Sequence, residues 1–425
     1  MLMLPYTKYK KADKEWIGDI PAHWSYVALR WISRIYSGGT PDKNNAPFWD
    51  NGTIPWVNSG EVNQLLIKEP TTFITEDAYK NSSAKWVSEG SLLIALAGQG
   101  KTKGMVAQTA INTTCNQSMA AICPNKNINP RYIFWWLISQ YRNIRGLAGN
   151  ELRDGLNLEM VGSISCPLPS DKEQAQIAAF LDQETARIDQ LITKKERQIE
   201  LLQEKRSTLI SHAVTKGLNP RAKMKESGID WLGEIPEHWK VKKLKYLFKN
   251  LDFRRIPLSG EERSYMQKNY PYYGASGIID MVENFIFEEA LLLVAEDGAN
   301  LLSRSTPLAF TAEGKYWVNN HAHILRPVHG PIKYWEGLLQ TFDYTPLISG
   351  AAQPKLTAEN LANISLPAPP ANEQNQIVEF INREAGLIDE MTHKIEKSLD
   401  LLCEYRTALI FAAVTGKIDV REEVA

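Results

Sequence analysis

The sequence has few cysteines, no long apolar run and almost no net charge, and each absence excludes a class of protein. Its 425 residues include four cysteines, none in a C-x-x-C pair, which is too few for a disulfide framework or a four-thiolate zinc site. No stretch approaches the ~18 apolar residues of a membrane helix, and charged residues precede any signal-like run at the N-terminus. We therefore expect a cytoplasmic protein without a membrane segment.

The net charge of −1 argues against a uniformly basic nucleic-acid binder, but the charge is unevenly distributed. Residues 1–166 carry 17 basic and 13 acidic side chains, whereas residues 367–425 carry 6 and 11. Within residues 240–255, seven basic side chains are opposed only by Asp252. Such a run either follows a phosphate backbone or forms a solvated surface, and the sequence leaves both interpretations open.

Catalytic and metal-binding motifs are also missing. Residues 95–102 fit a relaxed phosphate-loop pattern, but its first glycine is replaced and Gly104 follows where a helix should begin. Residues 129–132 lack the second proline of the amino-methyltransferase motif and are better explained by a proline at a helix start. His321 and His323 have no cysteine or carboxylate spaced to complete a metal site. We predict no catalytic residue and no metal in this chain.

Two segments of the chain occur twice. WIGDIPAHW at residues 16–24 recurs as WLGEIPEHW at residues 231–239, and 19 of the 45 residues of 173–217 are identical in 373–417. The segments between these repeats differ. The chain therefore contains two copies of one unit, and in each copy the repeated segments, which we call the frame, surround a variable insert. Diverged inserts indicate two related binding tasks on different targets, although neutral drift on a duplicated scaffold would give the same pattern.

The longer repeat predicts one long helix in each copy. Apolar residues recur with 4-3 spacing, and Arg206 and Arg406 occupy the same place in the two series. A proline-rich segment precedes each helix, and Gly217 and Gly416 follow where C-terminal caps are expected. About 40 residues give a length of roughly 60 Å. We expect the helices to pack antiparallel about an approximate two-fold; two unrelated amphipathic helices on separate domains are the alternative.

The inserts are predicted to be mixed α/β. Apolar runs at residues 91–96 and 290–295 have the length of buried strands, and each is followed by a turn containing glycine. Residues 130–138 and 331–339 are predicted helices with proline near the first turn. The expected fold class is α+β: two mixed α/β domains of shared topology, joined by two long helices that form an antiparallel coiled coil, with an internal pseudo-two-fold repeat.

Several motifs together resemble the specificity subunit of type I restriction-modification systems. In chain order they are the segment at 16–24 with its copy at 231–239, Gly38-Gly39-Thr40-Pro41 with Ile54-Pro55-Trp56 and Asn116-Gln117, Tyr270-Pro271-Tyr272-Tyr273-Gly274 with Asn319-Asn320-His321, and Glu-Gln-x-Gln-Ile at 173–177 and 373–377. The resemblance spans nearly the whole chain. It departs from the family at Ser170, where a second proline is usual before the helix.

The resemblance implies a non-catalytic subunit whose two target-recognition domains each read one half of an asymmetric bipartite site in double-stranded DNA. The helix pair would set the gap and dock two methyltransferase subunits, with nuclease-translocase subunits joining for cleavage. S-adenosylmethionine, ATP and magnesium would then belong to partner subunits, and no cofactor is expected in this chain. A two-headed protein adaptor that does not bind DNA is the alternative.

Under this interpretation the chain has four parts. We expect target-recognition domain 1 over residues 1–166, a first spacer helix over 167–217, target-recognition domain 2 over 218–366, and a second spacer helix with a tail over 367–425.

The candidate DNA contacts are polar and basic side chains of the predicted loops, because amides suit adenine edges, arginine suits guanine and lysine suits phosphate. They are Lys43, Asn44, Asn45, Asn58, Lys101, Lys103, Asn116 and Gln117 in the first insert, and Lys243, Arg254, Arg255, Arg304, Asn319, Asn320 and His321 in the second. Arg206 and Arg406 are the predicted partner-binding residues of the helix pair.

Overall fold

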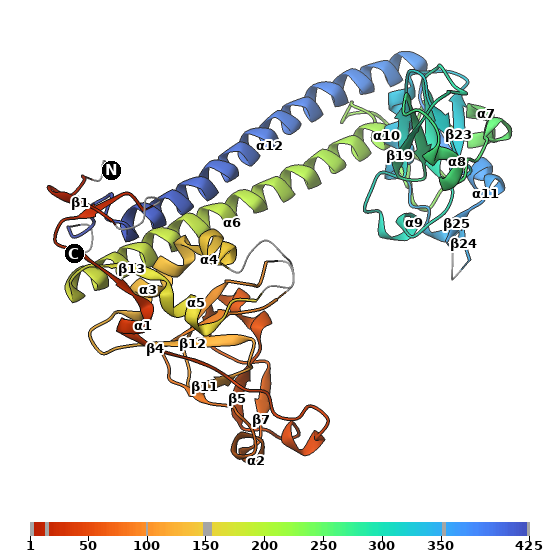
Figure 1. The fold of residues 1–425 in the computed structure, drawn as a ribbon. Helices are drawn as coiled ribbons and strands as arrows, with labels where there is room; N and C mark the ends of the chain where they lie inside the picture. The colour runs from red at the N-terminus through yellow and green to blue at the C-terminus, as the bar shows by residue number, and fades with distance from the viewer. Residues whose placement is uncertain (1–3, 13–16, 99–100, 148–154, 351–353, 423–425) are drawn as a thin grey trace. The chain divides into compact units, whose positions relative to one another are not determined.

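The chain divides into two compact units. The computed structural model describes residues 4–12, 17–98, 101–147, 155–350 and 354–422. Unit 1 consists of residues 1–194 and 398–425, and unit 2 of residues 195–397. Figure 1 shows that each unit contains one insert together with a part of both long helices.

The two long helices are α6 (Asp171–Lys216) and α12 (Ala371–Val414), with 46 and 44 residues. Both begin directly after the proline-rich segments and contain no proline, as predicted. At 1.5 Å per residue their lengths are about 65–70 Å. Gly217 and Gly416 follow with φ values of 76° and 67°, the left-handed conformation of a C-terminal cap.

Within each unit the parts of α6 and α12 are antiparallel. Unit 1 combines the beginning of α6 with the end of α12, and unit 2 combines the opposite parts. The same ion pair joins the helices in each unit: Arg406 Nε to Asp189 Oδ1 at 2.8 Å in unit 1, and Arg206 Nε to Asp389 Oδ1 at 2.9 Å in unit 2. Exposed pairs of this kind contribute about 0–1 kcal/mol, so they fix register more than they stabilise.

The repeated WIGDIPAHW segment holds the end of the helix pair in unit 1. His23 Nε2 lies 2.9 Å from Glu173 Oε1 in the first turn of α6. At the end of α12, a β-carbon added to Gly416 would lie 2.4 Å from Pro21 Cδ and 3.1 Å from Trp24. The segment therefore contacts the start of one helix and the end of the other. Its first residue, Trp16, lies outside the described residues.

The copy WLGEIPEHW makes the equivalent contacts in unit 2. His238 Nε2 lies 2.8 Å from Glu373 Oε2 at the start of α12. A β-carbon on Gly217, at the end of α6, would lie 3.2 Å from Trp239. The repeated segment therefore makes equivalent contacts with the helix ends in both units.

Each unit has a central sheet and a smaller second sheet. In unit 1 the strand orders are β4-β12-β9-β10-β6 and β7-β5-β11-β8; in unit 2 they are β17-β23-β20-β21 and β19-β18-β22. The shared topology predicted for the inserts is therefore confirmed. The strands of unit 1 are β4 (Ser33–Ser37), β5 (Ile54–Val57), β6 (Leu66–Ile67), β7 (Thr72–Ile74), β8 (Trp86–Val87), β9 (Leu92–Ala95), β10 (Val106–Thr109), β11 (Thr113–Cys115) and β12 (Met119–Pro124). Those of unit 2 are β17 (Phe248–Asn250), β18 (Tyr270–Gly274), β19 (Gly277–Val282), β20 (Leu291–Ala295), β21 (Ala309–Ala312), β22 (Trp317–Val318) and β23 (Ala322–Pro327).

Helices cover one face of each central sheet. The helices of unit 1 are α1 (Leu29–Ile32), η1 (Ala46–Phe48), η2 (Ser59–Gln64), α2 (Glu76–Lys80), α3 (Pro130–Ser139), α4 (Tyr141–Gly146) and α5 (Leu158–Ser163). Those of unit 2 are α7 (Leu244–Leu247), η3 (Asp252–Arg254), α8 (Gly260–Ser264), α9 (Asn300–Ser303), α10 (Ile332–Thr341), η4 (Thr345–Leu347) and α11 (Ala358–Asn363). Two-stranded ribbons complete the fold: β1 (Tyr9–Lys11) with β2 (Asp19–Pro21), β3 (Ser25–Ala28) with β13 (Ser165–Leu168), β14 (Met224–Glu226) with β15 (Glu234–Pro236), β16 (Lys240–Lys243) with β26 (Ser365–Ala368), and β24 (Ile348–Ser349) with β25 (Lys355–Leu356).

The central strands are buried on both faces, which explains their uninterrupted apolar sequences. On β9, Leu92 and Ile94 join the core formed with the helices, whereas Leu93 and Ala95 join the core between the two sheets. Strand β20 divides in the same way in unit 2. The core beneath the helices of unit 1 includes residues of both α6 and α12, among them Ile177, Leu181, Ile188, Leu409, Ile410 and Val414.

These observations confirm the predicted fold class, with two mixed α/β domains, two long helices and an internal repeat. The predicted strands and helices of the inserts are β9, β20, α3 and α10. The four-part division at residues 166, 217 and 366 stays a prediction.

Replacing Gly416 with alanine should destabilise unit 1 more than the same change at Gly90. Gly90 also has a positive φ, 81°, but an added β-carbon would meet nothing within 4 Å. The left-handed conformation alone costs alanine about 1–2 kcal/mol, so G90A should lose that amount. G416A should lose more, because its β-carbon also overlaps Pro21. Urea unfolding midpoints measure both, and equal losses would show that the contact with Pro21 relaxes freely.

Candidate DNA interface

In unit 1 two parallel strands end side by side at a polar turn. Strands β5 and β11 are paired in register, with Val57 opposite Cys115. The next residue, Asn116, donates its N–H to the Val57 carbonyl at 3.0 Å, and its side-chain oxygen accepts the N–H of Ser118 at 3.1 Å. The Asn116 side chain is used to close the turn. The side chain of Gln117, exposed at the tip, is therefore the group of this turn that a ligand can reach.

Unit 2 has the same turn at the same place. Strands β18 and β22 are parallel neighbours, and Asn319 donates its N–H to the Tyr273 carbonyl at 3.0 Å. The Asn319 side-chain oxygen accepts the N–H of His321 at 2.8 Å. Asn319 is buried, whereas Asn320 and His321 are exposed. We call residues 116–118 and 319–321 the asparagine turns.

The first asparagine turn lies against the loop that follows β4. The Gly39 N–H donates to the Cys115 carbonyl at 2.9 Å, and the Thr40 hydroxyl donates to the side-chain oxygen of Gln117. A β-carbon on Gly38 would lie 1.9 Å from the Cys115 carbonyl oxygen, so only glycine fits there. Thr40 is thus a polar neighbour of Gln117 that was missing from the predicted contacts, although it belongs to a motif that carried the family resemblance.

Four further predicted residues of unit 1 surround this loop. Lys43 and Asn44 are exposed, and Asn45 is half-buried before η1. Asn58 follows β5 and caps η2: its oxygen accepts the Gly60 N–H at 2.9 Å, and its amide donates to Glu61 at 2.9 Å. The capping role occupies Asn58, which leaves Lys43, Asn44 and Gln117 as the more accessible groups.

In unit 2 the second asparagine turn is held by polar contacts from side chains of neighbouring segments. His321 Nδ1 lies 2.8 Å from Asp297 Oδ1. Arg255 donates to the backbone carbonyls of Asn320 at 3.3 Å and Ala322 at 3.0 Å. The Arg255 side chain is only 16% exposed, so it supports the turn from beneath.

Arg255 belongs to a buried charged network that the sequence did not reveal. Within the described residues, Asp252, Glu296 and His323 each offer one potential metal-ligand atom, and these three atoms all lie within 4.8 Å of one another. Folding therefore brings to His323 the carboxylates that its neighbours in the sequence do not supply. Arg255 and Lys355 bind Glu296, so the chain's own cations already occupy a carboxylate that a metal would need.

Both ring nitrogens of His323 lie within hydrogen-bonding distance of a partner. Its Nε2 lies 2.8 Å from the Leu356 carbonyl, which only accepts, and its Nδ1 lies 2.7 Å from Asp252 Oδ2. Burial alone would raise the pKa of Asp252, but hydrogen bonds from His323, Asn250 and the Ile324 N–H outweigh it and hold that pKa below its usual range. Asp252 is therefore ionised near neutral pH, and His323 lies against it.

Arg254, next to this network, is exposed at the surface. Its guanidinium donates to the Ile286 carbonyl at 3.0 Å and lies 4.6 Å from the centre of the Phe287 ring. Glu289 Oε1 is 3.8 Å away and also contacts Arg326. Both arginines share the Glu289 carboxylate, and Arg254 directly precedes Arg255, which bonds the second asparagine turn.

Three predicted contacts lie against helices instead. Lys103 is buried, and the carbonyls of Lys101 and Lys103 accept hydrogen bonds from Tyr141 and Arg145 of α4. Arg304 donates to the carbonyls of Gln340 and Phe342 at the end of α10. These residues therefore contact structural elements outside the asparagine turns. Gly100 of the relaxed phosphate-loop pattern lies outside the described residues.

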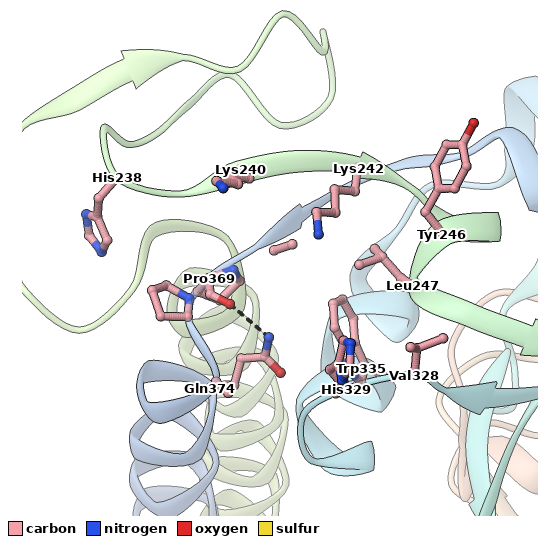
Figure 2. Close-up of a pocket in the computed structure, with 13 residues that line it drawn as sticks. His238, Lys240, Lys242, Tyr246, Leu247, Val328, His329, Trp335, Pro369 and Gln374 are labelled. Carbon is pink, nitrogen blue, oxygen red and sulfur yellow. Dashed lines mark hydrogen bonds between the residues drawn. The ribbon is translucent and has the colours of Figure 1, made fainter.

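The basic stretch of residues 240–255 is divided between two places. Lys240 and Lys242 are exposed on β16 and line a cavity of about 380 Å³ beside the start of α12. Figure 2 shows Lys242 extending over this cavity and Gln374 bonded to the Pro369 carbonyl. Lys243, also on β16, reaches Asn363 at 3.4 Å. The lysines of the stretch thus lie on β16, α7 and β17, whereas Arg254 and Arg255 belong to the segment that contacts the second asparagine turn.

The sequence model of the family described as "Type I restriction modification DNA specificity domain" matches residues 21–201 and 236–400. The chain belongs to this family. The two matches coincide with the two copies of the repeat. Family members are specificity subunits, the non-catalytic components of multi-subunit restriction-modification enzymes.

Individual relatives agree with this assignment. The specificity subunit of the Escherichia coli EcoR124I/EcoR124II enzyme is 29% identical over 199 residues, and the match spans 46% of each chain, about half its length. The putative MjaX specificity subunit of Methanocaldococcus jannaschii is 24% identical over 452 residues, covering 99% of this chain and 100% of that one. A solved chain from work on complex assembly in the type I R-M system has a TM-score of 0.72 at 15% identity, covers 94% of this chain, and supports the fold.

Among the described residues, no helix is both long and apolar enough to cross a membrane. In the helix pair, Arg206 and Arg406 each bind an aspartate of the other helix. Their predicted role in partner binding, like the individual DNA contacts, stays a prediction.

Replacing Asp252 with asparagine should destabilise unit 2 in a pH-dependent way. The lowered pKa means that ionised Asp252 stabilises the fold above the unfolded value of about 3.9, and this stabilisation is lost as the pH falls through the folded value. D252N should therefore lose about 1–3 kcal/mol near neutral pH and less near pH 3. Urea unfolding at both pH values measures this.

The matched control is D230N, which alters an exposed carboxylate of the same unit and should change little at either pH. An equal loss for D252N at both pH values would mean that the Asp252 carboxylate is not ionised in the folded chain.

Proposed function

We propose that this chain is the DNA-recognition subunit of a type I restriction-modification complex, and that each unit reads one half of an asymmetric bipartite site. The observation that carries the proposal is the asparagine turn, which recurs at the same point of the topology with different exposed side chains. Gln117 occupies its tip in unit 1, and Asn320 with His321 in unit 2. One framework with two different sets of hydrogen-bonding groups suits two different base sequences.

The partners follow from the parts that the units share. We infer that two methyltransferase subunits dock on the repeated frame, because two copies of one surface suit two copies of one partner. Nuclease-translocase subunits would join this assembly. S-adenosylmethionine, ATP and magnesium would be held by those partners, and the complex would act in the cytoplasm, where the DNA is.

Substitutions in the two turns should affect separate half-sites. With its methyltransferase subunits present, the chain should direct methylation to a split sequence, detectable by mapping modified adenines. Q117A should relax base preference in one half and N320A in the other, each by about 1–3 kcal/mol, since each removes groups that bond base edges. Each half-site serves as the control for the other. A contiguous methylated sequence, or loss of both halves together, would contradict the proposal.

Lengthening the helix pair should change the gap alone. Inserting one heptad into α6 after Lys194 and one into α12 after Lys397 adds about 10 Å to each helix. We expect the mapped gap to change while the half-site bases stay the same, because the reading turns belong to the two inserts. Substituting a heptad without changing helix length is the control. Altered half-site bases in the longer variant would show that the helices also take part in reading.

A salt titration separates this proposal from the two-headed adaptor. Contacts to phosphate release counterions, so affinity for duplex DNA should fall steeply with salt, with a slope near −0.9 for each phosphate neutralised. An adaptor would show no DNA affinity in low salt when tested with its partner subunits.

A further inference from the structure

One large apolar side chain of unit 2 is held out in solvent beside the second asparagine turn. Phe253 is 81% exposed, although a phenyl ring gains about 2–3 kcal/mol when it is buried. It occupies the middle of η3, the single turn between β17 and the loop that leads to α8. Isolated exposed apolar residues are common, so the exposure alone carries little weight.

The backbone on both sides of Phe253 is anchored. Before it, the Leu251 N–H donates to the Ile324 carbonyl at 2.8 Å, and Asp252 accepts the Ile324 N–H at 2.8 Å while it binds His323. After it, Arg255 reaches the Asn320 and Ala322 carbonyls. The buried charged network therefore fixes the turn that presents the phenyl ring.

Two further contacts fix the chain beyond Arg255. The Ile256 carbonyl accepts the indole N–H of Trp317 at 2.6 Å, and the Leu258 N–H donates to the Tyr272 hydroxyl at 2.9 Å. Trp317 and Tyr272 are paired on the strands that lead to the second asparagine turn. Phe253 is thus an exposed apolar group on a preorganised support that it shares with Asn320.

In the described part of unit 1, the equivalent position after β4 carries no side chain. Strand β4 pairs with β12 as far as Ser37, whereas the matching strand β17 stops pairing at Asn250. The residue after Ser37 is Gly38, and the Cys115 carbonyl excludes any side chain there. A partner that docks in the same way on both units would need the same group on both. Phe253 occurs in unit 2 alone, and it is therefore suited to the DNA half-site that unit 2 alone reads.

We propose that Phe253 is an apolar wedge that enters the DNA of the half-site read by unit 2, partly unstacks one base step and bends the duplex there. This proposal rests on the DNA-recognition function proposed above. Wedges of this kind enter the minor groove and kink DNA, most readily at flexible pyrimidine–purine steps. The guanidinium of Arg254, which is exposed and directly follows Phe253, would hold an adjacent phosphate.

The test uses the full chain assembled with its methyltransferase subunits and duplexes of the mapped methylation sequence. 2-Aminopurine, whose fluorescence rises when its base unstacks, is placed at successive positions of both half-sites. Methyltransferases extrude their target base, so wild type should raise the fluorescence at the methylated adenines and, as the signal of the wedge, at one further step found in the unit 2 half-site alone. F253A should abolish that rise and weaken binding roughly 5- to 150-fold, the range for losing an aromatic contact with a base. F253L, which keeps an apolar side chain, should retain most of the rise.

The control is Y265A, which removes another aromatic side chain of unit 2 that is 84% exposed and should leave the rise unchanged. Specific binding by wild type with no fluorescence rise apart from that at the methylated adenines would overturn the wedge and leave the recognition function standing. Absence of sequence-specific binding by wild type would overturn the recognition function itself. A loss confined to methyltransferase assembly in F253A would place the phenyl in a protein interface and also overturn the wedge.

Discussion

The packing of both long helices into the core of each unit is the constraint on which the rest of the structure depends. In unit 1, Ile177 and Leu181 from the start of α6 and Leu409 and Val414 from the end of α12 belong to one apolar core. These residues are separated by most of the chain, so neither copy of the repeat completes a unit by itself. The repeated tryptophan segments lie where one helix begins and the other ends, which keeps the two helices in fixed register at both ends.

The two units share some of their parts and differ in others. The helix ends, the two segments that contact them and the central sheets recur in both units. The asparagine turns also recur, but their exposed residues and the loops beside them differ. In unit 2 a buried network of Asp252, Arg255 and His323 supports the turn, whereas in unit 1 Gly38 packs directly on Cys115 and the Gly39 N–H donates to its carbonyl. The same position is thus stabilised in two chemically different ways.

The sequence predicted the elements whose signals are local. Helical spacing, flanking prolines and terminal glycines located α6 and α12, and the motif residues Asn116 and Asn319 marked both turns. It could not predict contacts made across long separations, such as the bond between His323 and Asp252, which are 71 residues apart. For the same reason it selected Lys103 and Arg304 by charge alone, although folding buries the first and places the second at the end of α10. The sequence did not indicate a role for Phe253, because the basic side chains of residues 240–255 were the only signal in that stretch.

The asparagine turns have a consequence for how such a protein changes over generations. The Asn116 side chain accepts the N–H of Ser118, and the Asn319 side chain accepts the N–H of His321. These bonds hold the turns, while the middle residue of each turn, Gln117 or Asn320, faces solvent. A substitution at that middle position alters the groups offered to a ligand and leaves the bond of the asparagine side chain in place, although at Gln117 it also removes the bond from Thr40. Under the proposed function, single substitutions there would change the base preference while the bonds of the two asparagines stay in place, so a lineage could move from one target to another without losing the fold.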